Sequence, residues 1–130
     1  DAIIALWTEA GLTRPWNDPR RDIQRKLRVQ PELFLVAAEP DGASILGSVM
    51  AGYDGHRGWL YYLATAASHR GQGIARALVG EAERLLTALG CPKVQLMVRE
   101  GNEEVLGLYD ALGYERFVVA NTGKRLIADA

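Results

Sequence analysis

The feature that most limits the fold is a change of hydrophobic period in the middle of the chain. Residues 59–65 read WLYYLAT, a run of aromatic and apolar residues that predicts a buried strand. HRGQG follows at 69–73, and an apolar stripe then recurs at helical spacing from Ile74 to Leu89. KVQLMV at 93–98 alternates again as a strand. Strand, helix and strand in this order predict a right-handed parallel unit, and hence a layered α/β fold.

The other elements are predicted from turn and cap residues. The strand at 59–65 follows two earlier strands in an antiparallel meander. In chain order these elements are a helix ending at Gly11, a helix from Asp18 to about Val29, strands at 33–39 and 45–53, a helix from Asn102 to Gly113, and strands at 115–120 and 124–128 joined by the turn NTG.

Composition excludes several classes of protein. A chain of 130 residues, 48% hydrophobic and 24% charged, predicts a single soluble domain over 1–130. Fifteen basic and sixteen acidic residues give no strong field for nucleic acid or an anionic membrane. No apolar run approaches the roughly 18 residues of a membrane span. The single cysteine excludes an internal disulfide, which suits the cytoplasm.

The glycines at 71 and 73 stand where backbone N–H groups commonly bind an anion. A Walker loop would need Lys-Ser/Thr where Ile74 and Ala75 stand, and a dinucleotide fingerprint would need a third glycine where Arg76 stands. What remains is Arg-x-x-Gly-x-Ala at 70–75. The plain alternative is a helix entry with flexible glycines and no ligand.

This hexapeptide resembles the pyrophosphate loop of the GCN5-related N-acetyltransferases (GNAT), Gln/Arg-x-x-Gly-x-Gly/Ala. About thirty residues further on, the family carries an Asn at a helix start and a Tyr seven residues later, which Asn102 and Tyr109 match. LGYE at 112–115 also fits the family's Tyr-x-x-x-Gly-Phe/Tyr ending. The resemblance covers nearly the whole chain. It implies a mixed central sheet with a splayed parallel strand pair and helices on both faces.

The resemblance also implies an activity and a binding site. Such an enzyme transfers the acetyl group of acetyl-CoA to a primary amine of a small molecule or a peptide N-terminus, and no metal is implied. The positions that match the family's cofactor-binding residues are Leu63, Ala64, Thr65, Arg70, Gly71, Gln72, Gly73, Ile74, Ala75, Arg76 and Asn102. A backbone N–H near Leu63 would stabilise the oxyanion that forms during the transfer.

Asn102 and Tyr109 each have a plain structural interpretation as well. Asn at a helix start favours an N-cap, and the apolar stripe of its helix favours Tyr109 as a packed core aromatic. By resemblance, Asn102 contacts the cofactor arm. Tyr109 would act as the general acid that protonates the departing CoA thiolate.

The general base is not assigned. Family members that acetylate ribosomal proteins carry a glutamate where Met97 stands. Glu100, Tyr61 acting through water, Asp54 and His56 are the candidates, as is a water chain to solvent. The missing acid favours a second hypothesis, a CoA-binding module without catalysis. A nucleotide-phosphate binder is a third.

Two further expectations concern the ends and the surface. The family starts with a strand before its first helix, and none is visible before Asp1. An open sheet edge would favour pairing with another chain, for example in a homodimer. The basic helix from Arg20 to Arg28 is typical of a solvated face. Because the family's first two helices border the acceptor site, this helix with Trp16 and Asn17 would alternatively recognise an acceptor that carries a carboxylate.

Overall fold

The computed structural model describes residues 1–42, 44–99 and 101–129. Its elements are α1 (Ala2–Glu9), α2 (Pro19–Lys26), the short 3₁₀ helix η1 (Pro31–Leu33), β1 (Phe34–Ala38), β2 (Ile45–Tyr53), β3 (Gly58–Thr65), the short 3₁₀ helix η2 (Ala67–His69), α3 (Ile74–Ala88), β4 (Val94–Gln95) and α4 (Glu103–Ala111). The predicted order of elements is therefore confirmed as far as α4.

The four strands form one mixed sheet in the order β1-β2-β3-β4. The first two pairs are antiparallel, and β3 and β4 are parallel. The parallel pairing joins only Gly58 to Val94 and Trp59 to Gln95, so most of β3 continues without β4 beside it. This is the separated parallel pair that the resemblance implies.

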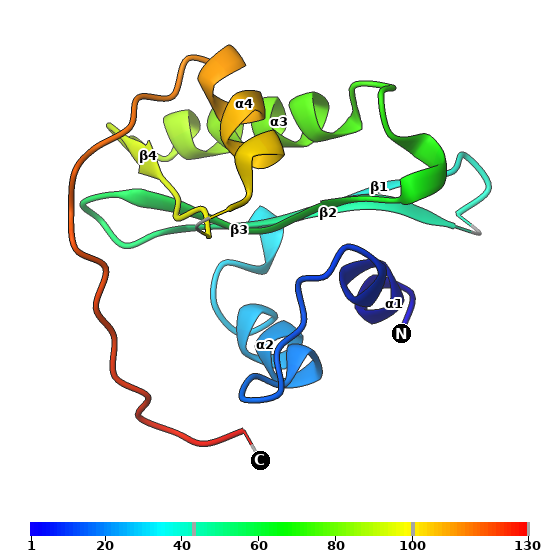
Figure 1. Ribbon diagram of the computed structural model, residues 1–130, viewed down its shortest axis with the longest axis horizontal. Coiled ribbons are helices and arrows are strands. Elements are labelled where there is room, and N and C mark those ends of the chain that lie inside the picture. Colours follow the sequence, from blue (N-terminus) through cyan, green and yellow to red (C-terminus); the bar gives the residue numbers. More distant parts are fainter. Residues whose placement is uncertain (43, 100, 130) are drawn as a thin grey trace.

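Helices cover both faces of the sheet, with α3 and α4 on one side and α1 and α2 on the other (Figure 1). Residues 47–51 of β2 are buried without a break, as expected for a strand that is covered on both faces. On the first side, Val79 and Ala82 of α3 pack in one cluster with Val49. On the second side, Trp7 of α1 packs with Met50 in another cluster. In the described parts of the chain, no helix combines the length and hydropathy that crossing a bilayer requires.

The segment after α4 contradicts the sequence prediction. Residues 115–120 and 124–128 form neither strands nor the NTG hairpin, and the strand predicted over 93–98 is only Val94–Gln95. A segment of alternating apolar residues forms a strand only where a neighbouring strand of similar length can pair with it. The neighbour here would be β4, which is only two residues long. Five large apolar side chains of these two stretches are accordingly exposed: Phe117, Val118, Val119, Leu126 and Ile127.

Polar contacts fix the end of this segment on α2. The segment after α4, called the tail below, runs around the outside of the molecule and reaches α2 (orange to red in Figure 1). The buried carboxylate of Asp129 accepts hydrogen bonds from the Asp18 backbone N–H (2.7 Å) and from Arg25 (2.6 Å). Arg125 donates to the side-chain oxygen of Asn17 at 3.0 Å. Hydrogen bonds and ion pairs of charged side chains, and not pairing between strands, therefore fix the end of the tail.

Candidate functional site

The loop between η2 and α3 exposes backbone N–H groups. Gly71 and Gly73 have φ of 82° and 79°, in the left-handed region that favours glycine. Gly73 is the N-cap of α3, and the first hydrogen bond of the helix runs from the Ala77 N–H to the Gly73 carbonyl at 3.0 Å. Within the described residues, the N–H groups at 74–76 donate to no backbone acceptor. They lie at the positive end of a 15-residue helix, an arrangement suited to an anion.

The second predicted set, Leu63 to Thr65, begins inside a bulge in β3. Ser48 of β2 pairs with Ala64 and Met50 pairs with Tyr61, so β3 carries one extra residue between these pairs. Tyr62, inside the bulge, has φ of 54°, which is rare for a bulky residue. A bulge leaves backbone groups out of the sheet ladder. Backbone strain of this kind persists where the surrounding structure holds it, and it is frequent at functional sites.

One ring stack and three hydrogen bonds hold the bulge in place. The rings of Trp7 and Tyr62 stack with centroids 3.8 Å apart and planes within 9°. The Trp7 Nε1–H donates to Ser48 Oγ at 2.8 Å, and this hydroxyl donates to the Tyr62 carbonyl at 2.8 Å. The Tyr62 hydroxyl donates to Asp22 at 2.7 Å. Burial, followed by the hydrogen bond to Asp22, raises the pKa of Tyr62, so the hydroxyl remains a donor.

The chain of hydrogen bonds through Ser48 predicts a stability effect. Ser48→Ala would leave the Trp7 N–H and the Tyr62 carbonyl without their partner in a fully buried place. We expect the free energy of unfolding to fall by about 1–3 kcal/mol, measured by urea denaturation. The matched change at an exposed serine, Ser68→Ala, should alter it much less. Equal stability of the Ser48→Ala variant and the wild type would show that these bonds do not hold the bulge.

Tyr109 is a packed core aromatic, as its helical stripe predicts. It is 5% exposed and meets Tyr114 edge to face, with ring centroids 5.1 Å apart and planes at 64°. Burial, with a smaller contribution from the charge of Glu83, raises the pKa of its hydroxyl. No hydrogen bond to this hydroxyl is formed by any residue that the structure describes, although a buried tyrosine hydroxyl usually has a partner. The group is therefore protonated and free to donate.

Asn102 stands directly before α4, where the sequence places it. Its side chain makes no capping hydrogen bond, so the expectation of a side-chain cap is wrong. Glu103 and Glu104 lie in the first turn, where their negative charges interact favourably with the positive end of the helix dipole. They stabilise the start of α4 in the absence of a side-chain cap. The exposed amide of Asn102 therefore remains available for other contacts.

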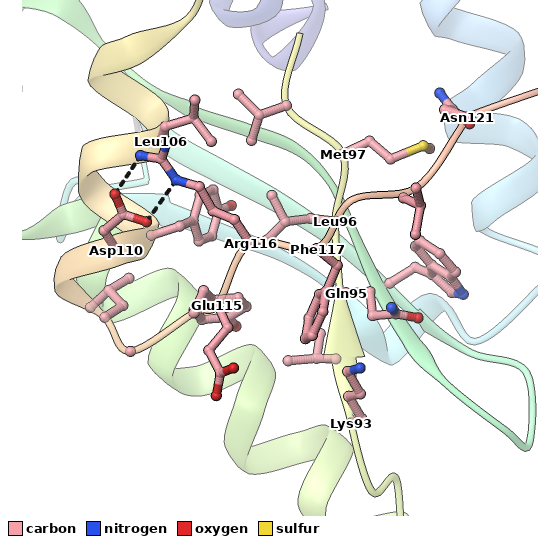
Figure 2. A pocket seen from close by; sticks show the side chains of 18 of the residues that line it. Lys93, Gln95, Leu96, Met97, Leu106, Asp110, Glu115, Arg116, Phe117 and Asn121 are labelled. Carbon is pink, nitrogen blue, oxygen red and sulfur yellow. Dashed lines mark hydrogen bonds and ion pairs between the residues drawn. The ribbon is translucent and has the colours of Figure 1, made fainter. Parts of the chain in front are cut away.

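A pocket of about 700 Å³ lies between β4, α4 and the start of the tail (Figure 2). An ion pair of Arg116 with Asp110 lines it, and the Lys93 ammonium lies 4.1 Å from the centre of the Phe117 ring. Among the predicted site residues, Tyr109 alone lines this pocket. The space is left because the tail does not pair with β4. The predicted anion site at the glycine loop therefore lies apart from this pocket.

Two of the described candidates for the general base, Tyr61 and Asp54, lack the features of one. Met97 is 55% exposed and lies beyond the end of β4. Burial, then the charge of Asp54, raises the pKa of Tyr61, which disfavours its phenolate. Asp54 accepts from the backbone N–H groups of Arg57 and His56, which lower its pKa and make it a turn residue. Glu100 lies outside the described residues.

A second pocket, of about 390 Å³, opens beside the bulge. Its lining residues are Asp22, Arg25, Lys26, Val29, Met50, Tyr61 and Tyr62. Sequence reasoning missed this site and the support of the bulge, because Tyr62 is 40 positions from Asp22 and 55 from Trp7. The one available signal was the basic character of α2.

Comparison with known proteins identifies the family. The model of the acetyltransferase (GNAT) family matches residues 2–114. An acetyltransferase of Pectobacterium atrosepticum is 55% identical over 129 residues, which cover 99% of this chain and 90% of the relative. An acetyltransferase of Yersinia enterocolitica is 54% identical over the same shares.

Solved structures of other proteins have a similar fold. Ard1 from Thermoplasma volcanium has a TM-score of 0.75 and 22% identity over 90% of this chain and 78% of that chain, which shows a shared fold. The NatC complex, solved with Gag peptide and CoA, has a TM-score of 0.78 and 26% identity over 90% of this chain and 77% of that chain. The sequence match over 2–114 and the relatives at more than half identity settle the family: this chain belongs to the GNAT acetyltransferases.

Proposed function

We propose that this acetyltransferase takes its acetyl group from acetyl-CoA and transfers it to a primary amine of a small molecule or a peptide N-terminus. The observation that carries the proposal is the glycine loop, whose left-handed Gly71 and Gly73 precede N–H groups at the start of α3 that donate to no described backbone acceptor. The NatC complex, a structural neighbour, was solved with both CoA and a peptide, which supports this donor and this class of acceptor.

The donor fits the described residues in three places. The pyrophosphate would accept hydrogen bonds from the N–H groups at 71–76, with Arg70 and Arg76 adding positive charge. The pantetheine arm would lie along Leu63–Thr65, where β3 continues beyond its pairing with β4. The free amide of Asn102 would contact the same arm.

The chemistry follows from these positions. The amine nitrogen attacks the thioester carbonyl, and a backbone N–H near Leu63 stabilises the oxyanion. The new C–N bond remains when the C–S bond breaks, and the proton of the amine leaves through water. Tyr109 donates a hydrogen bond to the sulfur as negative charge develops, and its proton as the thiolate leaves. A phenol is a weaker acid than a thiol, and burial raises the pKa of Tyr109 further, so transfer of its proton to the thiolate is uphill and the hydrogen bond to the sulfur supplies most of the stabilisation.

Release of free CoA thiol from acetyl-CoA across a panel of amines tests the function. We expect acceptor-dependent release together with an acetylated amine in the products. Tight binding of acetyl-CoA without turnover on any amine would instead favour a CoA-binding module, the alternative suggested by Met97. Thermal stabilisation by ATP or NAD, but not by CoA, would favour a nucleotide-phosphate binder.

A further inference from the structure

Lys26, the last residue of α2, is a largely buried lysine whose ammonium has no hydrogen bond or ion pair with any described residue. The residue is 8% exposed. Across residues 1–42, 44–99 and 101–129, no hydrogen bond or ion pair reaches its ammonium within the usual distances. Its Nζ lies over Gly52 of β2, where a Cβ would stand 3.8 Å away. Burial lowers the pKa of this ammonium, partly opposed by the charge of Glu32.

The other charges of the second pocket are already paired. Arg25 donates to Asp22 at 3.2 Å and to Asp129 at 2.6 Å. Asp22 also accepts from the Tyr62 hydroxyl at 2.7 Å. Lys26 is therefore the charge that the described lining of this pocket leaves without compensation. Because this ammonium is partly desolvated and lines the pocket, an anion bound beside it would attract it more strongly than in water.

The pocket also lies where an acceptor would approach. Two of its lining residues are Tyr61, which directly precedes the bulge of β3, and Tyr62, which shares the bulge with Leu63. In the proposed function, the thioester carbonyl lies at an N–H near Leu63. An amine that attacks it from this side would place the rest of its molecule in the second pocket, whose volume of about 390 Å³ accommodates a small acceptor.

We propose that Lys26 binds a carboxylate of the acceptor, so that the enzyme prefers amines that are also carboxylic acids, such as small amino acids. The inference rests on the proposed function, because it assigns the substrate class of the same site. A carboxylate bound there would pair with the Lys26 ammonium, whereas Asp22 and Arg25 already pair with each other and with other groups.

The test compares matched acceptors and matched variants. Glycine, β-alanine and 4-aminobutyrate are assayed beside their amides, which keep the size and remove the charge. Lys26→Met keeps the buried stem and removes the ammonium. We expect Lys26→Met to raise KM about tenfold for the acid of best fitting length, as for a hydrogen bond between charged groups. KM for its amide should not change. The ratio of wild type to variant cancels differences in the pKa of the amines.

Two controls separate this role from a structural one. Arg28→Met removes an exposed charge two positions away and should change neither KM. Lys26→Arg should retain part of the preference for acids. Lys26→Met should be at least as stable as the wild type in urea, because it keeps the packed stem and removes a partly desolvated charge.

Several outcomes would overturn the proposal. Equal losses on acids and amides in a folded Lys26→Met variant would contradict it, as would a wild type that prefers the amides. Failure of every acceptor, amides included, would overturn the proposed function instead. Calorimetry of N-acetyl-4-aminobutyrate and N-acetyl-β-alanine on the CoA-loaded protein then decides the inference alone. Binding that Lys26→Met weakens supports it, and equal or undetectable binding rejects it.

Discussion

Replacing Tyr109 with phenylalanine should lower kcat about a hundredfold and leave the protein folded, with nearly normal affinity for acetyl-CoA. The ring stays, so the edge-to-face contact with Tyr114 and the packing in the core are kept. Only the hydroxyl is lost, and no described residue depends on it for a hydrogen bond. General acid catalysis commonly contributes about 10²–10⁴-fold. We expect the low end, because a thiolate is a good leaving group and a phenol is a weaker acid than a thiol.

Steady-state kinetics and calorimetry of acetyl-CoA provide the measurement. Tyr114→Phe is the matched control: it also keeps a ring and removes a hydroxyl, which donates to Glu83 at 2.7 Å. It should change stability slightly and kcat little. Because burial raises the pKa of Tyr109, any alkaline fall in kcat that this acid causes should lie above the ordinary range of tyrosine. That fall should be absent from Tyr109→Phe. Wild-type turnover in the variant would show that Tyr109 is a core aromatic and nothing more.

The sequence predicted the parts of the fold whose signals are local. The strand around Tyr61, the glycine turn and the stripe of α3 each follow from period and turn chemistry within a few residues. They reappear as Gly58–Thr65, two left-handed glycines and Ile74–Ala88. Asp18 followed by Pro19 likewise begins α2, and the Asp18 carboxylate accepts from the Arg20 N–H at 2.9 Å.

The remainder depends on partners that are far apart in the sequence. Alternation at 115–120 indicates a strand, but its outcome depends on how much of β4 is available for pairing, and only Val94 and Gln95 are paired. The bulge at Tyr62 needs Trp7 and Ser48 at the correct distance, which no local pattern encodes. Lys26 is another example: within a basic helix it is typical of a solvated face, and only packing against β2 makes it a buried cation.

Gly73→Val should weaken the binding of acetyl-CoA at least about a hundredfold, because it disturbs the loop that we assign to the pyrophosphate. Gly73 has φ of 79°, which a β-branched residue adopts only at a cost of about 1–3 kcal/mol, so the turn would change conformation. The N–H groups that converge there would separate, and losing one or two hydrogen bonds to a charged group accounts for the expected effect. The protein should still fold, because a Cβ at this position meets no atom within 4 Å.

Two comparisons isolate the pyrophosphate from the rest of the donor. Gly80 lies in the same helix, is exposed and has no atom within 4 Å of its would-be Cβ, so Gly80→Val tests the cost of valine in α3 without touching the loop. It should bind acetyl-CoA normally. Acetyl-pantetheine lacks the pyrophosphate, so the wild type and Gly73→Val should use it equally, although both poorly. If the assignment is correct, the loop matters only to a donor that carries phosphates. Two results would contradict the assignment of residues 70–76 to the pyrophosphate. One is unchanged calorimetric affinity for acetyl-CoA in a folded Gly73→Val variant, and the other is an equal loss on acetyl-pantetheine.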